Sequence, residues 1–279
     1  MPKKVFLLVF ALTACRTVTF TGTKFFVKTA ADGPSVTLAA NSTPTRFTMK
    51  DGITLDGYWV RTPEAIGTLL CLPGSGDSAG NMQQTLGAWG QALGLNVLVV
   101  DYRGAGRSEG TGSIAAVTAD LAEVIAQWRA LPERGPDRLI VYGVSMGSMA
   151  AARLAAENPT LFAAVILDSP AVNTVEWASN MVPWYAAPFV TVKIGGDLAA
   201  LDTEEAVRGF TVPLLLVVGS DDKITPPAFA ERVFSASASP ARTLKVVRGA
   251  QHAEASDRPE FLPLVGTFVR SALTNQIAR

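Results

Sequence analysis

The sequence predicts an α/β fold with a mainly parallel central sheet and helices on both faces. From about residue 46 onwards, strand-like and helix-like segments alternate towards the end of the chain. Strand-like runs such as Asn96–Val100 are apolar throughout, as expected for parallel strands buried on both faces. The chain has 279 residues, of which 48% are hydrophobic and 17% charged, so it is long and apolar enough for one large domain. Repeated β-α units of this kind build a parallel sheet between two layers of helices.

The expected elements follow one another in a regular order. Arg46–Lys50 and Ile53–Val60 flank Asp51-Gly52, a dipeptide that favours a hairpin turn. Further strands are expected at Thr68–Leu72, Asn96–Val100, Arg138–Tyr142, Ala164–Leu167, Leu214–Val218 and Thr243–Val247. Helices are expected at Asn81–Leu93, Thr118–Leu131, Met146–Glu157, Pro227–Ser235 and Pro259–Leu273.

Residues 171–210 interrupt this alternation. Their large apolar side chains include Trp177, Met181, Trp184, Tyr185 and Phe189. We expect a small cap insertion over the carboxyl ends of the strands, where open α/β sheets bind ligands. The same side chains fit two interpretations equally: an apolar acyl or aromatic pocket under the cap, or a small core of the cap itself.

The amino terminus has the pattern of a bacterial export signal. Lys3 and Lys4 precede an apolar run from Val5 to Ala11, which is about half of the length needed to span a bilayer. The sequence Leu-Thr-Ala-Cys that ends at Cys15 resembles a bacterial lipobox, in which the signal is cleaved before the Cys and that Cys is lipid-modified. A plain secretory signal with an incidental Cys is the alternative.

The lipobox interpretation divides the chain into three parts. Residues 1–14 are the predicted signal peptide, residues 15–44 a tether or loosely ordered N-terminal segment, and residues 45–279 the α/β domain. Two or more acyl chains on Cys15 are enough for stable membrane attachment. The next residue is Arg16 rather than Asp, which among bacterial lipoproteins favours delivery to the outer membrane. We therefore expect a lipid-anchored protein of the bacterial cell envelope, on its periplasmic or surface side.

The composition argues against several classes of function. The 24 acidic and 24 basic side chains balance, so the chain has no basic field that would favour nucleic acid. Its two cysteines are too few for a disulfide framework, and one histidine without a Cys-x-x-Cys pair excludes the usual zinc sites. No metal and no cofactor are therefore expected.

Gly-x-Ser-x-Gly, a pattern typical of an activated serine, occurs twice. In Gly143–Gly147, Ser145 follows an apolar strand and precedes a helix that begins with small residues. The glycines permit the tight strand-to-helix turn that exposes the serine hydroxyl. In Gly106–Gly110, Ser108 lies in a polar, glycine-rich loop with no helix beginning beside it. We therefore expect Ser145 to be the nucleophile and Ser108 to be structural.

A serine nucleophile needs a base, and the base needs a carboxylate to orient it. His252 is the only histidine of the chain and follows the last predicted strand, which favours the base over an ordinary surface residue. The carboxylate is expected between Ser145 and His252 in chain order. Asp222 begins an Asp-x-x-Thr-Pro sequence whose turn would hold it still. Asp221 is the fallback, and Asp168, at the end of an earlier strand, is a more remote possibility.

The chemistry also requires two backbone N–H groups that face the developing oxyanion. One is expected from Met146, directly after the nucleophile. The other is expected from Ser75, in the loop Pro73–Asp77 that follows a predicted strand.

With these residues in place, the chain resembles the α/β-hydrolase superfamily, and within it the branch of serine-aminopeptidase-like and α/β-hydrolase-domain lipases and esterases. The resemblance covers about residues 45–275. Besides the Ser145 motif it includes the loop Asp101–Gly110, which is similar to that branch's loop after its fourth strand. It implies the α/β-hydrolase fold with Ser145 as nucleophile, Asp222 as acid and His252 as base.

The chain departs from this family in the predicted oxyanion loop. Leu72-Pro73-Gly74 stands where family members usually have His-Gly. A backbone N–H still serves there in principle, but the changed loop puts its geometry in question. The departure motivates one alternative function, a non-catalytic binding protein on the same fold at the membrane.

The expected function is a serine hydrolase that cleaves an ester or related acyl bond of a small molecule through an acyl-enzyme. An acyltransferase is a further alternative, because an alcohol in place of water intercepts the acyl-enzyme. A remote alternative is a dinucleotide-dependent oxidoreductase, since Gly74-x-Gly76-x-x-Ala79 lies between a strand and a helix and Asp101 ends the next strand. That alternative leaves the serine, aspartate and histidine unexplained.

Overall fold

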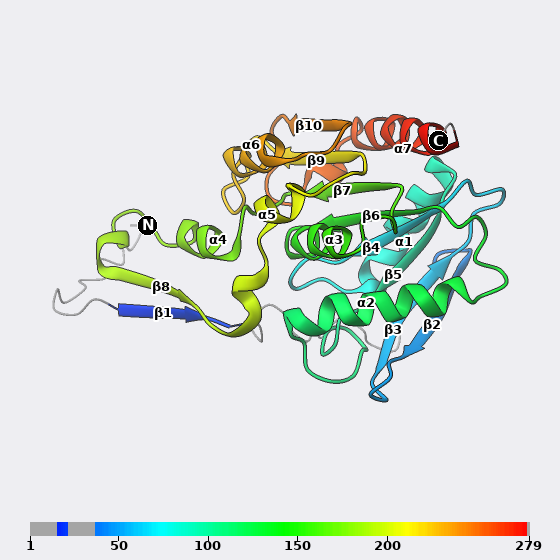
Figure 1. Cartoon of the computed structure of the whole chain (residues 1–279), viewed down its shortest axis with the longest axis horizontal. Helices are drawn as coiled ribbons and strands as arrows, with labels where there is room; N and C mark the ends of the chain where they lie inside the picture. Colours follow the sequence, from blue (N-terminus) through cyan, green and yellow to red (C-terminus); the bar gives the residue numbers. More distant parts are fainter. Residues whose placement is uncertain (1–15, 22–36, 278–279) are drawn as a thin grey trace, which may run out of the picture.

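The described part of the chain, residues 16–21 and 37–277, forms an α/β fold in this computed structural model (Figure 1). The strands are β1 (Arg16–Phe20), β2 (Ser42–Thr48), β3 (Thr54–Val60), β4 (Thr68–Leu72), β5 (Asn96–Val100), β6 (Leu139–Val144), β7 (Ala164–Asp168), β8 (Val190–Ile194), β9 (Leu214–Gly219) and β10 (Arg242–Val247). The α-helices are α1 (Ala79–Leu93), α2 (Ile114–Arg129), α3 (Met146–Glu157), α4 (Thr174–Asn180), α5 (Thr203–Val207), α6 (Pro227–Ala236) and α7 (Phe261–Ile277). Short 3-10 helices are η2 (Ala187–Phe189), η3 (Gly196–Ala200) and η4 (Ala255–Asp257).

Eight strands form the central sheet, in the order β10-β9-β7-β6-β4-β5-β3-β2. The strands from β10 to β5 are parallel, whereas β3 is antiparallel to β5 and β2 is antiparallel to β3. The β2–β3 hairpin closes around Gly52, whose φ of 85° is readily adopted only without a Cβ. The predicted fold class, a mainly parallel sheet with an opening hairpin, is confirmed.

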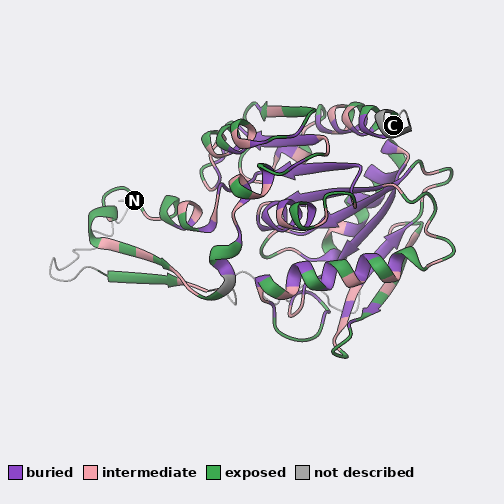
Figure 2. Cartoon of the chain, in the orientation of Figure 1, coloured by how far each residue is buried: buried purple, intermediate pink, exposed green. Residues whose placement is uncertain are grey.

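The sheet separates two apolar layers because successive side chains of a strand point to opposite faces. In β4, Leu70 and Leu72 pack into the layer that contains α2, α3 and α5. Leu69 and Cys71 pack into the layer that contains α1 and α7. Figure 2 shows the inner strands of the sheet as buried between these helices, whereas the edge strands β2 and β10 are largely exposed or half-buried. The helices therefore lie on both faces, and the carboxyl ends of the parallel strands are left to carry the site.

Between β7 and β9 the chain leaves the sheet and forms a cap from α4, η2, β8, η3 and α5. Strand β8 pairs in parallel with β1, so that Arg16 lies opposite Val190 and Phe20 opposite Ile194. Figure 1 shows the β1–β8 ribbon projecting away from the body of the molecule. None of the helices in the described ranges is long and apolar enough to cross a bilayer.

The segment 15–44, expected to be a tether, contains ordered structure at both ends of its described part. Residues Arg16–Phe20 form a strand of the cap, and β2 begins at Ser42, before the expected domain boundary. The cause of the first difference is tertiary, since β1 pairs with a strand far along the chain and has no local partner to predict it. The predicted signal peptide and Cys15 lie outside the described residues.

Candidate active site

Ser145 lies in the sharp turn between β6 and α3. Its backbone has φ 53° and ψ −118°, and a non-glycine residue held in such a sparsely populated region costs about 1–3 kcal/mol. Close packing requires the neighbouring glycines. A Cβ on Gly143 would lie 2.1 Å from the carbonyl oxygen of Gly147, and one on Gly147 would lie 2.1 Å from that of Leu72. The structure thus places Ser145 in the strand-to-helix turn that the glycine spacing predicts.

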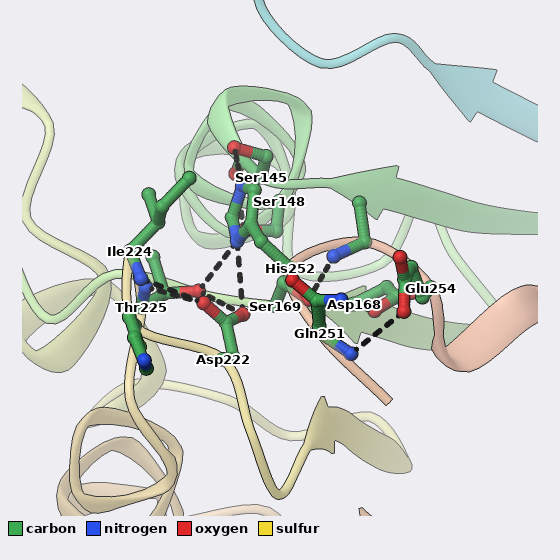
Figure 3. Close-up of polar contacts among 12 residues, drawn as sticks. Ser145, Ser148, Asp168, Ser169, Asp222, Ile224, Thr225, Gln251, His252 and Glu254 are labelled. Carbon is green, nitrogen blue, oxygen red and sulfur yellow. Dashed lines mark hydrogen bonds and ion pairs between the residues drawn. The ribbon is translucent and has the colours of Figure 1, made fainter. Parts of the chain in front are cut away.

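Ser145, His252 and Asp222 form a continuous hydrogen-bonded row (Figure 3). His252 Nε2 lies 2.9 Å from Ser145 Oγ, and His252 Nδ1 lies 2.9 Å from Asp222 Oδ2. The side chain of His252 is 19% exposed, whereas that of Asp222 is 0% exposed. The three residues come from the turns after β6, β9 and β10, which the parallel sheet brings to one edge. This geometry allows the imidazole to take the serine proton while the buried carboxylate orients the ring.

Asp222 faces the histidine, and the adjacent Asp221 does not. Asp222 Oδ1 accepts the backbone N–H groups of Ile224 at 2.9 Å and Thr225 at 2.8 Å. Burial raises the pKa of Asp222, but the hydrogen bonds from His252 and Thr225 together lower it by more than burial raises it. The pKa of Asp222 therefore lies below the ordinary value. Asp221 is exposed and accepts the hydroxyl of the preceding serine at 2.7 Å.

Thr225 is a site residue to which the sequence assigned only a turn. Its hydroxyl donates to Asp222 Oδ2 at 2.8 Å, and its Oγ1 lies 3.1 Å from His252 Nδ1. The residue is 1% exposed. The Asp-x-x-Thr-Pro spacing predicts the turn, but the return of the threonine hydroxyl to the aspartate is visible only once the turn is folded.

A second buried carboxylate, Asp168, lies at the end of β7 beneath the histidine loop (Figure 3). Its Oδ2 accepts the hydroxyl of Tyr142 at 3.0 Å, and its Oδ1 accepts that of Ser169 at 3.1 Å. Ser169 Oγ in turn accepts the backbone N–H of Ala253, the residue after His252, at 3.1 Å. Burial raises the pKa of Asp168 to about 6, against the lowering effect of the Tyr142 and Ser169 hydrogen bonds. The carboxylate thus supports the loop that carries the base, rather than the base itself.

The two residues expected to stabilise the oxyanion, Ser75 and Met146, line one cavity together with Ser145. Met146 is the first residue of α3, where backbone N–H groups have no acceptor within the helix. The loop that carries Ser75 passes close to the nucleophile, since a Cβ on Gly74 would lie 3.5 Å from that of Ser145. The hydroxyl of Tyr102 donates to the carbonyl of the residue before Gly74 at 3.0 Å, which holds the altered loop in place.

The sequence is similar to a group of known proteins. A family model described as "Serine aminopeptidase, S33" (Hydrolase_4) matches residues 63–198. An uncharacterized protein of Mycobacterium tuberculosis (strain H37Rv) is 31% identical over 207 residues, which are 73% of this chain and 69% of that protein. The chain belongs to the α/β-hydrolase superfamily. The uncharacterized protein YfhR of Escherichia coli (strain K12) is also similar to this hydrolase, being 29% identical over 246 residues, or 82% of this chain and 81% of that protein.

A solved structure shows the same fold at lower sequence identity. The esterase Pf2001 of Pyrococcus furiosus superposes on the hydrolase with a TM-score of 0.67 and 20% identity. The match covers 83% of this chain and 93% of that chain. At this identity the likeness concerns the fold, and it confirms the α/β-hydrolase fold that the sequence predicts.

Two cavities of the hydrolase meet at Ser145. The first, the histidine-side cavity, has a volume of about 330 Å³ and is lined by Gly74, Ser75, Asp77, Asn81, Met82, Thr85, Leu86, Trp89, Tyr142, Val144, Ser145, His252, Ala253, Ser256 and Asp257. The second, the apolar cavity, has a volume of about 190 Å³ and is lined by Phe20, Ser75, Ser145, Met146, Met149, Ala171, Trp177 and Thr225. Ser145 therefore has open space on two sides, and the linings of the two spaces differ.

The second Gly-x-Ser-x-Gly copy lies in the loop between β5 and α2. Ser108 is 4% exposed, and its hydroxyl donates to the carbonyl of Asp101 at 2.9 Å. Its Oγ also accepts the backbone N–H of Asp56, at 2.9 Å. Both capacities of this hydroxyl are used by the backbone, which gives Ser108 a structural part in the hydrolase.

Two other predicted features concern lipid and metal. Cys15, the expected lipidation site, lies outside the described residues and directly before β1. Among residues 16–21 and 37–277, no three His, Cys, Asp or Glu side chains gather in a way that would hold a metal ion. Cys71 is fully buried in β4, and burial raises the pKa of its thiol well above the usual range.

Proposed function

We propose that this hydrolase is a serine esterase that cleaves a carboxylic ester through a covalent acyl-enzyme. The observation that carries the proposal is the row from Ser145 through His252 to Asp222, with 2.9 Å at each of its two hydrogen bonds. Serine is a weak nucleophile unless a base lies within this reach and a third group orients the base. Further support comes from the family to which the chain belongs and from its likeness in fold to a protein named as an esterase.

The proposed reaction begins with attack of Ser145 Oγ on the ester carbonyl. His252 Nε2 takes the serine proton, and Asp222 stabilises the imidazolium that forms. The carbonyl oxygen becomes an oxyanion that accepts the N–H groups of Ser75 and Met146. The C–O bond to the alcohol then breaks, and His252 returns its proton to the leaving oxygen. In the second half, His252 removes a proton from water, the resulting hydroxide attacks the acyl carbon, and Ser145 leaves with the proton restored.

We also propose that the enzyme works at the membrane surface of the bacterial cell envelope. The support is the sequence before β1, where Leu-Thr-Ala-Cys ends at Cys15 and resembles a lipobox. Labelled palmitate fed to expressing cells should enter the wild type and not Cys15→Ser. Equal labelling of the two proteins would overturn the lipid anchor and would leave the esterase proposal untouched.

The test of the esterase proposal is labelling with a fluorophosphonate probe, which reacts with activated serines. The wild type, Ser145→Ala and Ser108→Ala are compared at equal concentration, after circular dichroism has shown that each is folded. We expect labelling of the wild type and Ser108→Ala and none of Ser145→Ala. Labelling that persists in Ser145→Ala would show that the nucleophile is a residue other than Ser145. An unlabelled wild type would favour the non-catalytic binding protein.

A further inference from the structure

The two cavities beside Ser145 differ in whether they contain the base. His252 lines the histidine-side cavity, together with the loop that follows it. Met146, whose N–H is the expected oxyanion donor after the nucleophile, lines the apolar cavity and not the histidine-side cavity. Ser75 lines both cavities and lies at their junction with Ser145.

This difference assigns the two halves of an ester to the two cavities. In the proposed reaction the leaving oxygen receives its proton from His252 Nε2, so the alcohol must lie on the histidine side. The acyl carbon is bonded to Ser145 Oγ, and the acyl group extends away from the base. Of the two spaces around the nucleophile, the apolar cavity is the one that receives it.

The apolar cavity is small and is closed by apolar side chains. Met146, Met149 and Ala171 are each at most 5% exposed and form its inner surface. Its volume of about 190 Å³ is little more than half of the about 330 Å³ of the histidine-side cavity. We expect the smaller space to favour a short aliphatic or single-ring acyl group over a long fatty acyl chain.

The outer wall of the apolar cavity comes from the N-terminal strand. Phe20, the last residue of β1, packs edge-on against Trp177 of α4, with 5.6 Å between the ring centroids. The position of Phe20 is fixed by its pairing with Ile194 of β8 and by the N–H of Gly195, which donates to the Phe20 carbonyl at 2.8 Å. A strand near the amino terminus thus completes a pocket whose nucleophile lies far along the chain.

The histidine-side cavity is larger, and its lining is mixed, with Met82, Leu86, Trp89 and Val144 beside several polar groups. Asp77 and Asp257 contribute carboxylates to its surface, and Asn81 and Thr85 contribute an amide and a hydroxyl. None of its described lining residues is Lys or Arg. Carboxylates without a neighbouring cation attract positive charge and hydroxyl donors and repel anions. This cavity suits an alcohol that is cationic or rich in hydroxyls, and it opposes a phosphate or carboxylate.

We propose that the substrate is an ester of a short apolar or aryl acid with a polar, non-anionic alcohol, and that β1 sets the acyl-chain limit through Phe20. The proposal rests on the proposed esterase function. It goes beyond that function in naming the two halves of the substrate and a residue that selects one of them.

The acyl half is tested with 4-nitrophenyl esters of acetate, butyrate, octanoate and laurate. Fluorophosphonate titration first counts the competent active sites, so that a misfolded fraction does not enter kcat/KM. The wild type should prefer butyrate over laurate, and Phe20→Ala should shift the laurate-to-butyrate ratio about tenfold towards laurate, since one or a few methylenes in an apolar pocket are worth about that much. Trp177→Ala should shift the ratio in the same direction. Val18→Ala is the matched control, because Val18 lies on the same strand but is 39% exposed, and it should leave the ratio unchanged.

The outcomes separate the inference from the proposed function. An unlabelled wild type would contradict the esterase itself. A labelled and active wild type whose chain-length profile is the same in Phe20→Ala and Val18→Ala would overturn the part assigned to β1. A wild type that prefers laurate would overturn the proposal that the acyl group is short.

The alcohol half is tested with three butyrate esters: those of choline, glycerol and glycerol 3-phosphate. The wild type should hydrolyse the first two at least about tenfold more efficiently than the third, because the carboxylates of the histidine-side cavity repel the phosphate. Asp77→Asn with Asp257→Asn should lower the choline-to-glycerol ratio, and Glu133→Gln, at an exposed position outside the cavity, should not. Equal rates on the choline and phosphate esters would overturn this half.

Discussion

The two Gly-x-Ser-x-Gly copies of the chain use glycine and serine in opposite ways. In Gly143–Gly147 the serine carries the positive φ, 53°, and the glycines are needed because backbone carbonyls lie where their Cβ atoms would be. In Gly106–Gly110 the glycines carry the positive φ, 48° and 78°, and Ser108 has an ordinary backbone. The same five-residue pattern therefore describes a serine with a strained backbone in one place and a tight loop in the other.

The surroundings of the two serines explain the difference. Ser145 follows a central strand, so its side chain rises at the edge where the β9 and β10 loops bring Asp222 and His252. Ser108 lies against the start of β3, where the loop is held by backbone hydrogen bonds such as Glu109 N–H to Thr54 O at 2.9 Å. A hydroxyl that meets an imidazole is available for chemistry, and one that bridges two backbone groups is not.

Replacement of Ser145, the proposed nucleophile, should have the largest effect. Ser145→Ala should lower kcat/KM for 4-nitrophenyl butyrate by about 10⁴- to 10⁶-fold, because the attacking oxygen is lost while the rest of the site remains. The measurement is steady-state hydrolysis with the thermal midpoint as the folding check. A loss of less than tenfold in a folded variant would place the nucleophile elsewhere.

Replacement of the two adjacent aspartates, Asp221 and Asp222, should have very different effects on activity. Asp222→Asn should lower kcat/KM by about 10⁴-fold, because the amide favours the wrong imidazole tautomer. Asp221→Asn, one position earlier on an exposed side chain, should change it less than twofold. Equal losses in the two variants would contradict the assignment of the acid.

The glycines of the two copies should differ in what their replacement costs. Gly147→Ala puts a Cβ 2.1 Å from a backbone carbonyl and should lower the free energy of unfolding by about 3 kcal/mol or more, with loss of activity. Gly110→Ala meets nothing closer than 3.4 Å and carries only the penalty of its positive φ, about 1–2 kcal/mol. Urea unfolding measures both, and a more stable Gly147→Ala than Gly110→Ala would contradict the packing argument.

The buried carboxyl group of Asp168, near the loop that carries His252, should make the stability of the protein depend on pH. The pKa of Asp168 is about 6 in the folded protein against an ordinary value of 3.8. The folded state therefore binds the carboxyl proton of Asp168 more tightly than the unfolded chain does. The resulting stabilisation is fully present below pH 3.8 and is lost as the pH rises to about 6, which lowers the free energy of unfolding by about 3 kcal/mol in total.

The variant Asp168→Asn isolates this effect, because it cannot ionise. The free energy of unfolding of Asp168→Asn minus that of the wild type should rise between about pH 4 and pH 6 and stay level above it, whatever constant offset the amide introduces. Asp222, whose pKa is lowered, acts in the opposite sense below its ordinary value but is common to both proteins. Parallel stability curves over this range would contradict the raised pKa.

The smallest effect on activity is expected for the buried copy. Ser108→Ala leaves the N–H of Asp56 and the carbonyl of Asp101 without their hydroxyl partner and should lower the free energy of unfolding by about 1–3 kcal/mol. Its kcat/KM per titrated active site should equal that of the wild type. A catalytic loss in this variant would mean that the loop acts on the site and does not only support the sheet.

The sequence by itself determined much of the body of the hydrolase. Thr68–Leu72, Asn96–Val100 and Met146–Glu157 are predicted with the bounds that the structure has, because apolar periodicity and strand-to-helix turns are local properties. The position of Ser145 follows from glycine spacing for the same reason. His252 follows from the single histidine of the chain, so that no choice among candidates was needed.

Only the tertiary structure decided the features that join distant residues. The sequence prefers Asp222 and keeps Asp221 as the fallback, whereas the folded turn shows that Asp222 faces His252 and that the hydroxyl of Thr225 donates to it. Likewise, the pairing of β1 with β8 places part of the expected tether in the wall of the apolar cavity. Pairing across so many residues leaves no periodic trace in either segment, since each strand has only five residues and its partner lies far along the chain.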